Sequence, residues 1–451
     1  MNGLSGTQEN QPATNEVKIM KKSTVAIICV IIAVFAVTVA LSSHFSGATL
    51  LNGLGRKTTA ELTIGNYTNY RTTELQEILS IVNHEDSEQS EFTNSYSYSA
   101  KSFEPSQTYV KPIGRTVYNN GQRWFSMSGS GVEFNCKAEA VELTLLSENN
   151  SYISYNHKPR VAVFVEDCLV FDQSLEKDET TVRIDLSQFG GNAAISVVKL
   201  SESMHSCCGI GNITIYGNKD IKPTEDKPLK LEFLGDSITC GYGIDEPNRN
   251  AGFSTRTENF AKSYAYLTSK MLGADYSAIA FSGYGVVSGY TTNGRRNENA
   301  TIFKYYDKAI TNKKQSEDFP TDEWNSLSYA PDIVVINLGT NDASYCKTSE
   351  RRAEFVSEYK RLISLVREKN QNAYILCILG DMNNSLYPSI ETAVNEYQSE
   401  TYDQKISCTK INFKMGENPI VIAGHPGAES NYLAAQDLAN TIINLRYAGK
   451  I

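Results

Sequence analysis

The sequence predicts an α/β domain with a parallel sheet, preceded by an all-β sandwich and an N-terminal transmembrane helix. Three observations predict this order. Residues 229–451 alternate short apolar strands with amphipathic helices, as in parallel sheets that are covered by helices. Residues 108–218 contain short alternating runs separated by turn residues, as in a β-sandwich. Residues 24–41 are uncharged and almost wholly apolar, and this length just suffices for a helix to cross a bilayer.

Composition excludes several classes of protein. A chain of 451 residues corresponds to about three domains of ordinary size. Its 41% apolar and 21% charged residues are typical of globular proteins. The net charge of −9 argues against nucleic-acid binding, which requires clustered Lys and Arg. The 26 Tyr and 17 Phe offer surfaces for stacking on sugars, but strands and cores use the same residues.

The N-terminus predicts a single-pass membrane protein. Lys18, Lys21 and Lys22 precede the apolar run, and no Lys or Arg follows it before Arg56. The positive-inside rule therefore places residues 1–22 in the cytoplasm, residues 23–42 in the membrane and the remaining chain outside. A cleaved signal peptide is the alternative, although its leader would be long and no clear cleavage site follows the run.

Two further regions separate this helix from the α/β domain. Residues 43–107 are rich in Ser, Thr, Asn and Glu and predict a polar stalk. Residues 108–218 lack helical periodicity and predict a sandwich of the jelly-roll type. Its clearest strand candidates are residues 141–146, 160–165, 181–186, 194–200 and 212–216.

The α/β domain follows a short polar linker at residues 222–228. The predicted strands are residues 229–234, 276–281, 332–338 and 373–379, and the predicted helices are residues 260–272, 351–369 and 431–446. Ligands bind at the carboxyl ends of strands in such sheets. The sequence therefore directs attention to the residues that follow the first three strands.

Four short segments supply candidate catalytic groups at that edge. Gly235-Asp236-Ser237 follows the first strand and offers a hydroxyl nucleophile beside its own N–H. Ser282-Gly283-Tyr284-Gly285 follows the second strand, and Gly339-Thr340-Asn341-Asp342 follows the third. His425 precedes the last helix and is the one histidine of this domain. Each segment alone is weak evidence, since turns favour the same residue types.

In this order the four segments resemble those of the SGNH (GDSL-type) hydrolase superfamily, over residues 229–451. The resemblance implies a flavodoxin-like domain in which Ser237 is the nucleophile and His425 the general base. It also implies an oxyanion hole made by Ser237, Gly283 and Asn341, with Gly285 as the alternative to Gly283. We expect no cofactor and no metal, because a side-chain base activates the nucleophile.

The wider context is similar to carbohydrate esterase family 2. The similar segments are Leu234 to Gly243, Phe253-Ser254-Thr255, Thr257-Glu258-Asn259-Phe260, Ser282 to Val287 and Val334 to Asp342. That family also has a jelly-roll domain before its hydrolase domain. The resemblance implies a serine esterase that removes O-acetyl groups from polysaccharides such as glucomannan or xylan.

One residue departs from the superfamily. Its usual last segment is Asp-x-x-His, but Ile422 stands three residues before His425. We therefore predict a Ser–His dyad in which a backbone carbonyl or another side chain holds the second ring nitrogen. Glu417 and Glu429 are near in sequence, but nothing in the sequence assigns either of them to this role.

The sequence leaves substrate and partner questions open. Tyr345 and Trp324 are candidates for stacking on a sugar, although core packing is the more common role for the tryptophan. A lipid or thioester acylhydrolase is a rival function, because the same four segments serve those substrates. A non-catalytic carbohydrate-binding surface protein is a second rival. Eight cysteines follow Cys29, and spacing does not decide between free thiols and disulfides.

Overall fold

The computed structural model describes residues 100–148, 153–186, 189–217, 220–311, 323–380, 382–416 and 418–451. The predicted cytoplasmic tail, the predicted membrane helix and the predicted stalk up to residue 99 lie outside the described residues. Within the described ranges, none of the helices combines the length and the apolar character that a bilayer crossing requires.

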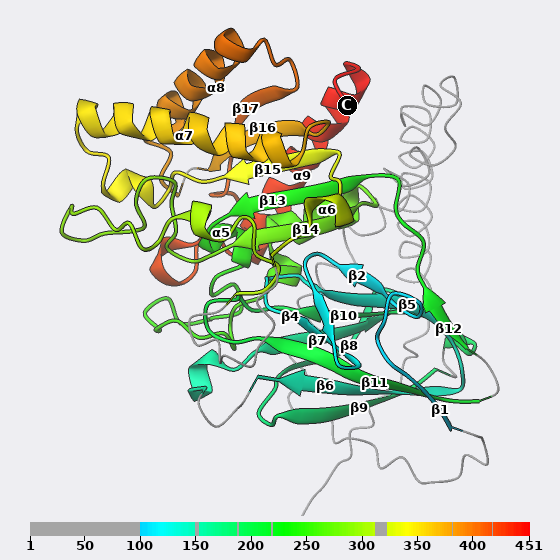
Figure 1. Cartoon of the computed structure of the whole chain (residues 1–451). Helices are drawn as coiled ribbons and strands as arrows, with labels where there is room; N and C mark the ends of the chain where they lie inside the picture. Colours follow the sequence, from blue (N-terminus) through cyan, green and yellow to red (C-terminus); the bar gives the residue numbers. More distant parts are fainter. Residues whose placement is uncertain are drawn as a thin grey trace, which may run out of the picture. The chain divides into compact units, whose positions relative to one another are not determined.

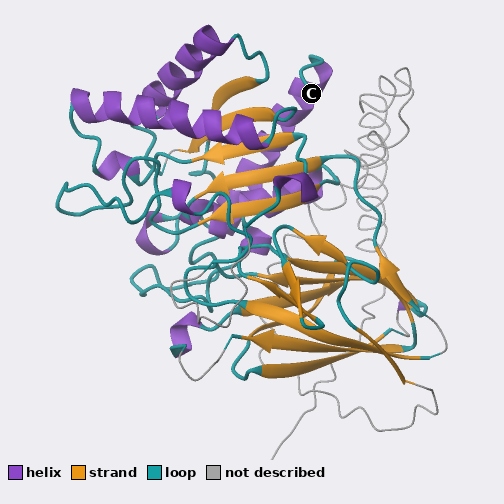
Figure 2. Ribbon diagram, viewed as in Figure 1, coloured by secondary structure: helices purple, strands orange, loops and turns teal. Residues whose placement is uncertain are grey.

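The first described domain is a sandwich of two antiparallel sheets (Figure 2). One sheet has the strand order β3-β4-β11-β6-β9, with β1 beside β11, and the other has the order β12-β5-β10-β7-β8, with β2 beside β5. The strands are β1 (Ala100–Phe103), β2 (Lys111–Ile113), β3 (Val117–Asn119), β4 (Gln122–Phe125), β5 (Gly131–Lys137), β6 (Ala140–Ser147), β7 (Arg160–Val165), β8 (Cys168–Ser174), β9 (Glu179–Asp185), β10 (Asn192–Lys199), β11 (Cys208–Tyr216) and β12 (Ile221–Pro223). The predicted antiparallel sandwich is therefore confirmed.

The sandwich core follows from the alternating pattern of its strands. In β6, Val141, Leu143 and Leu145 are buried in one apolar cluster with residues of the facing sheet such as Val163 and Val197. Successive side chains of a strand point to opposite faces, so this spacing gives β6 one continuous inner face. The sheets extend beyond the predicted boundaries of 108 and 218, because β1 pairs with β11 and β12 pairs with β5.

The second domain is a five-stranded parallel sheet with helices on both faces (Figure 1). Its order β14-β13-β15-β16-β17 is the 2-1-3-4-5 order of doubly wound sheets. The strands are β13 (Lys230–Gly235), β14 (Asp275–Ala280), β15 (Ile333–Asn337), β16 (Tyr374–Gly380) and β17 (Ile406–Ile411). The α-helices are α5 (Ser237–Cys240), α6 (Tyr264–Met271), α7 (Ser349–Lys369), α8 (Tyr387–Thr401) and α9 (Ala428–Tyr447). The predicted parallel α/β domain is confirmed.

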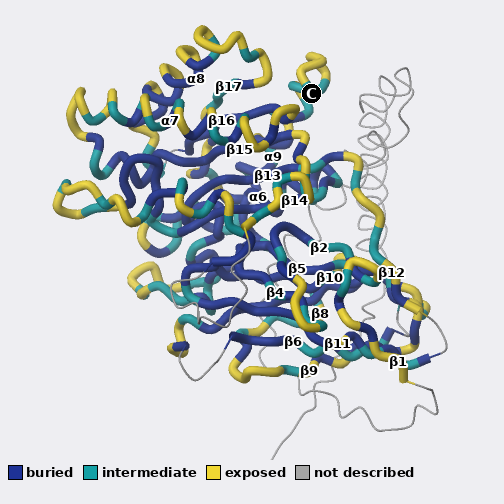
Figure 3. The backbone as a smooth tube through the Cα atoms, in the orientation of Figure 1, coloured by how far each residue is buried: buried dark blue, intermediate teal, exposed yellow. Residues whose placement is uncertain are grey.

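Neighbouring residues of β13 show how the two faces of this sheet are covered. Leu234 belongs to the apolar cluster that contains Phe355 of α7 and Ile390 of α8. The preceding residue, Phe233, packs edge-to-face on Tyr264 of α6. Helices α7 and α8 therefore cover one face of the sheet, and α6, which contacts α9, covers the other. Strands β15 and β16 are buried at every residue, and β13 and β14 at every residue but the first (Figure 3).

One strand and one helix of this domain were absent from the sequence-based prediction. Strand β17 reads Ile-Ser-Cys-Thr-Lys-Ile and lies at an edge, where polar residues are tolerated because one side faces solvent. Helix α8 begins beside a proline at its first turn and ends at Tyr402 with a φ of 59°. Their weak apolar patterns reflect partial exposure, which periodicity alone cannot separate from a loop.

The two domains are joined through buried charged groups. Arg160 of β7 pairs with Asp172 of the sandwich at 2.6 Å and with Asp245 of the α/β domain at 2.8 Å. Lys262 also pairs with Asp245, at 2.5 Å. A second buried pair joins Arg115 to Glu232 at 3.3 Å. These contacts place the sandwich directly against the α/β domain within one compact unit.

Candidate active site

The candidate site lies where the strand order of the parallel sheet reverses. Strand β13 stands between β14 and β15, and helices leave in opposite directions from such a switch point, which leaves a crevice. Ser237, Gly283 and Asn341 follow β13, β14 and β15, respectively. The sheet therefore delivers all three predicted groups to one edge.

Ser237 occupies the turn from β13 into α5. Asp236 caps this short helix by accepting the N–H of Ile238 at 3.1 Å. Gly235 is required for the turn, because a Cβ there would lie 2.0 Å from Oγ1 of Thr239. Ser237 is only 6% exposed, so its hydroxyl is presented in a largely desolvated pocket.

His425 contacts Ser237 directly. The Ser237 hydroxyl lies 2.7 Å from Nε2 of His425, and Nδ1 lies 3.1 Å from the carbonyl oxygen of Ile422. A carbonyl can only accept, so Nδ1 carries the proton and Nε2 accepts the hydroxyl proton. The backbone carbonyl therefore holds the imidazole in the tautomer that a general base needs.

The loop before His425 has the shape that this contact requires. Ala423 and Gly424 have φ values of 51° and 76°, which turn the chain back on itself. The N–H of Val421 then donates to the carbonyl of His425 at 2.7 Å. The predicted carbonyl acceptor is thus contributed by Ile422, the same residue that replaces the usual acid.

Burial controls the protonation of the candidate base. Burial lowers the pKa of His425 to about 4, although the carbonyl of Ile422 and the charge of Glu202 act in the opposite direction. His425 is therefore neutral above that pH and can accept a proton.

Gly283 and Gly285 differ in whether their N–H groups are available. The N–H of Gly285 donates to the carbonyl of Ala300 at 3.1 Å. A Cβ at Gly285 would also lie 2.2 Å from the carbonyl oxygen of Ser288. By contrast, no acceptor in the described part of the chain takes the N–H of Gly283, and a Cβ there would meet no atom within 4 Å. The geometry therefore favours Gly283 as a donor toward the crevice.

The side-chain amide of Asn341 is fixed at the same edge. Its Nδ2 donates to Oδ2 of Asp236 at 3.1 Å and to the carbonyl of Tyr284 at 2.8 Å. Burial raises the pKa of Asp236 to about 7 and that of Asp342 to about 6. Both acids accept backbone N–H groups, so they order the turns in which they lie.

Aromatic rings extend from the catalytic candidates into the sandwich. Tyr242 stacks on His425 with ring centroids 4.3 Å apart, and Phe253 stacks on Tyr242 at 4.9 Å. His205 lies 4.8 Å from Phe253, and His157 stacks on His205 at 4.2 Å. Two histidines outside the α/β domain thus approach the site, which the sequence did not predict.

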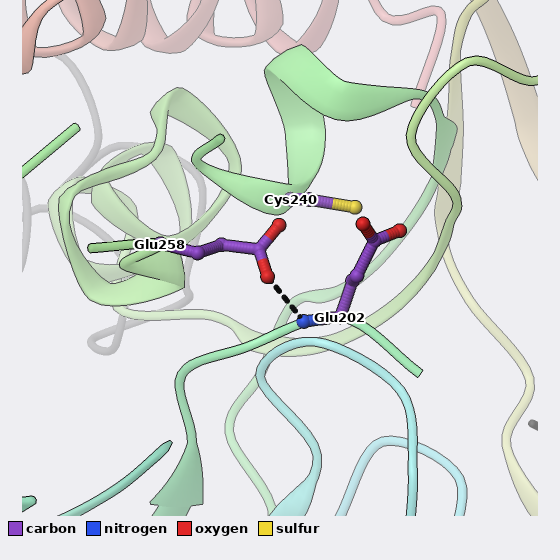
Figure 4. Close-up of side chains that lie close together, drawn as sticks. All are labelled: Glu202, Cys240 and Glu258. Carbon is purple, nitrogen blue, oxygen red and sulfur yellow. Dashed lines mark hydrogen bonds between the residues drawn. The ribbon is translucent and has the colours of Figure 1, made fainter. Parts of the chain in front are cut away.

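A buried group of potential metal ligands lies beside the site (Figure 4). Glu202 of the sandwich, Cys240 of α5 and Glu258 converge so that their ligand atoms lie within 4.8 Å of one another. Oε2 of Glu258 accepts the backbone N–H of Glu202 at 2.7 Å. Two carboxyl groups and one thiol could bind a cation such as zinc.

The close approach of Glu202 and Glu258 does not require a cation if one of the two carboxyl groups is protonated. Burial, followed by the charge of Glu202, raises the pKa of Glu258 well above its ordinary value. Burial alone would also raise the pKa of Glu202, but the nearby His205 and the N–H of Ser282 lower it. These opposite shifts favour the protonated form of Glu258 beside the ionised form of Glu202.

The two candidate stacking residues are engaged elsewhere. The ring of Tyr345 lies under the guanidinium of Arg351 at 4.3 Å, and its hydroxyl donates to Glu354 at 3.2 Å. Trp324 packs against Arg115 and an apolar cluster between the domains. None of these contacts involves Ser237 or His425. The eight described cysteines are free thiols.

Sequence reasoning missed Glu202, Tyr242 and the role of the sandwich in the site. The one available signal was the segment around Phe253 and Glu258, which was noted only for its resemblance. Glu202 reaches the site through a long-range contact between domains, and one sequence offers no means to detect such a contact.

Comparisons with known proteins find a matching family model and similar curated proteins. Residues 231–435 match the GDSL-like Lipase/Acylhydrolase family. The chain is 33% identical over 279 residues to the cellulase/esterase CelE of Acetivibrio thermocellus, covering 57% of this chain and 33% of that relative. It thus spans a third of the length of CelE. It is 23% identical to an acetylxylan esterase/glucomannan deacetylase of Cellvibrio japonicus, covering 77% of this chain and 91% of that relative.

A solved structure shows the same fold. The acetyl xylan esterase Est2A from the rumen bacterium Butyrivibrio proteoclasticus superposes with a TM-score of 0.69 at 20% identity. The match covers 78% of this chain and 99% of Est2A. The sandwich and the parallel domain therefore occur together in another protein.

Proposed function

We propose that this chain, which matches the GDSL-like Lipase/Acylhydrolase family over residues 231–435, is an esterase that removes O-acetyl groups from a polysaccharide such as glucomannan or xylan. Ser237 is the nucleophile and His425 the general base. The observation that carries this proposal is the 2.7 Å contact between the Ser237 hydroxyl and Nε2 of His425. The named relatives support an acetylated carbohydrate as the substrate class.

The reaction begins with proton transfer within the dyad. His425 takes the hydroxyl proton of Ser237 through Nε2 as the oxygen attacks the ester carbonyl. The imidazolium that forms is stabilised by the carbonyl of Ile422, which already accepts the Nδ1 proton. A neutral acceptor stabilises this charge less than a carboxylate would.

Three donors serve the oxyanion of the tetrahedral intermediate. They are the N–H groups of Ser237 and Gly283 and the side-chain amide of Asn341. The amide proton that Asp236 accepts can be shared with the oxyanion as a three-centre bond. His425 then protonates the departing sugar oxygen. A water molecule repeats the cycle on the acyl-enzyme and releases acetate.

The test is acetate release from acetylated glucomannan and acetylated xylan by the purified full chain. We expect release by the wild type and by Ser328→Ala, which changes an exposed serine before β15. Ser237→Ala should lower kcat by at least about 10³-fold, since it removes the nucleophile. Hydrolysis of a long-chain acyl ester without acetate release would favour the lipid acylhydrolase. Carbohydrate binding without hydrolysis of any ester would favour the non-catalytic binder.

We also propose that residues 24–41 anchor the chain in a membrane and that the catalytic domain faces outward. Their apolar character and the lysines before them support this orientation. Extraction of expressing cells with alkaline carbonate tests the anchor. An anchored chain stays in the membrane pellet at its full length, whereas recovery of a shortened chain in the supernatant would indicate a cleaved signal peptide.

A further inference from the structure

A loop of the β-sandwich crosses into the candidate active site. It comprises residues 201–206, between β10 and β11. Oε2 of Glu202 accepts the N–H of Ser282 at 2.8 Å, and Sδ of Met204 lies 3.9 Å from the hydroxyl of Tyr284. These contacts fall on the residues immediately before and after Gly283. The sandwich loop therefore holds both sides of the glycine that faces the crevice.

Glu202 is itself fixed by contacts from both domains. Its N–H donates to Oε2 of Glu258 at 2.7 Å. Nζ of Lys199 donates to the carbonyl oxygens of Ser201 and Glu202 at 2.6 Å and 2.7 Å. Lys199 and Glu202 are almost completely buried. A buried charge is costly unless it is hydrogen-bonded, so these bonds must offset the desolvation of Glu202 and Lys199.

We propose that Glu202 is a positioning residue for the esterase reaction: the sandwich supplies a carboxylate that orients the oxyanion segment at Ser282 and Gly283 and places a negative charge near His425. This inference rests on the proposed function. Glu202 acts through Ser282 and His425 and does not touch the substrate. The sandwich is thus a part of the catalytic machinery.

The contact with Ser282 sets the direction of the next N–H group. Ser282 and Gly283 share a peptide plane, and Gly283 adopts a φ of 81°. Anchoring the N–H of Ser282 limits rotation of the backbone just before this plane. The N–H of Gly283 is therefore aimed before the substrate arrives, which is the condition for effective oxyanion stabilisation.

The charge of Glu202 acts on the base. It raises the pKa of His425 against the effect of burial. The other titratable and charged groups around Glu202 are His205, Glu258, Cys240, Tyr242, Tyr284 and Lys199. Because burial and the charge of Glu202 favour the protonated form of Glu258, the carboxylate charge of this pair is assigned to Glu202. Removing it should make the imidazolium of His425 less stable.

Two variants separate the effect of the hydrogen bond to Ser282 from the effect of the charge on Glu202. Glu202→Ala removes the acceptor of Ser282, and we expect kcat for a small acetyl ester to fall by about 10²-fold while KM changes by less than about twofold. Glu202→Gln keeps an acceptor oxygen but removes the charge, so kcat should fall less. In this variant the acid limb of the pH profile should move to lower pH, because the pKa of His425 decreases.

The matched control is Glu148→Gln. Glu148 is also a buried glutamate of the sandwich, and its Oε2 accepts the N–H of Cys207 at 3.0 Å. Its pH profile and kcat should equal those of the wild type. Wild-type kcat in folded Glu202→Ala, or an unmoved acid limb in Glu202→Gln, overturns the proposal.

An NMR titration of the His425 ring tests whether Glu202 acts on the pKa of His425, and it does not depend on measuring esterase activity. We expect a lower pKa in Glu202→Gln than in the wild type and an unchanged pKa in Glu148→Gln. Equal values in all three proteins overturn the role of Glu202, even where the protein releases no acetate. A shifted value in a protein without esterase activity would instead contradict the proposed function alone.

Discussion

At the scale of single residues, His425 combines a neutral acceptor with a buried ring. The carbonyl of Ile422 fixes its tautomer, while burial lowers its pKa to about 4. A base with such a pKa loses its function only when the imidazole is protonated, which occurs as pH falls through that value. This low pKa of His425 therefore predicts activity that persists in mildly acidic solution.

We expect the acid limb of kcat/KM for a small acetyl ester to lie near pH 4. This profile reports ionisations of the free enzyme, and it is measured between pH 3 and pH 8 with the fold followed by circular dichroism. A limb near about 6.5, the ordinary value for histidine, would contradict the buried, neutral base.

The same residue shows what sequence reasoning could and could not supply. The strand order predicted that Ser237, Gly283 and Asn341 share one edge of the sheet, whereas the pairing of Ser237 with His425 was implied by the family resemblance. The acceptor for Nδ1 depends on the φ values of Ala423 and Gly424, and no side-chain pattern encodes a backbone carbonyl. Gly283 and Gly285 were likewise separable only when the bond from Gly285 to Ala300 was seen.

At the scale of elements, Asp342 joins the ends of two strands. It follows β15, and its Oδ1 accepts the N–H groups of Val286, Val287 and Ser288 at 3.0, 2.7 and 3.0 Å. These residues follow β14, so one carboxyl group orders the segment next to Gly283. Three buried donors depend on this acceptor.

We expect Asp342→Ala to lower the free energy of unfolding by about 3 kcal/mol or more, since each buried donor left unsatisfied costs about 1–3 kcal/mol. Asp342→Asn keeps one acceptor oxygen and should cost less. Urea denaturation of the two variants measures the difference. Equal midpoints for both variants would contradict the role of the three bonds.

Elements with strong periodicity were predictable. Strands β13 and β15 and helices α7 and α9 have continuous or amphipathic apolar patterns, and the predicted ranges overlap the observed ones. Strand β17 and helix α8 were missed because they are partly exposed. They carry polar residues at positions where an apolar residue would have revealed the period of the element.

At the scale of the whole molecule, the sandwich and the α/β domain share buried charges. Arg160 bridges Asp172 and Asp245, and its loss would leave Asp172 without this cation and Asp245 with Lys262 alone. Breaking a buried ion pair by removing one partner costs about 3–5 kcal/mol. The two domains should therefore unfold as one unit only while this bridge is intact.

We expect Arg160→Ala to lower the melting temperature and to split a single calorimetric transition into two. Arg183→Ala is the control, because Arg183 pairs with Glu142 within the sandwich and is more than half exposed. An exposed pair contributes at most about 1 kcal/mol. Identical calorimetric traces for the two variants would show that Arg160 does not couple the domains.

The use of a backbone carbonyl to orient His425 also has consequences for mutation at position 422 and for sequence searches. A side-chain acid can be lost through one codon change, but every residue at position 422 would bring the same carbonyl group. The side chain of Ile422 is then free to pack against Gly243, where a Cβ would lie 2.5 Å from it. A search that demands an aspartate three residues before the histidine would therefore overlook the base proposed here.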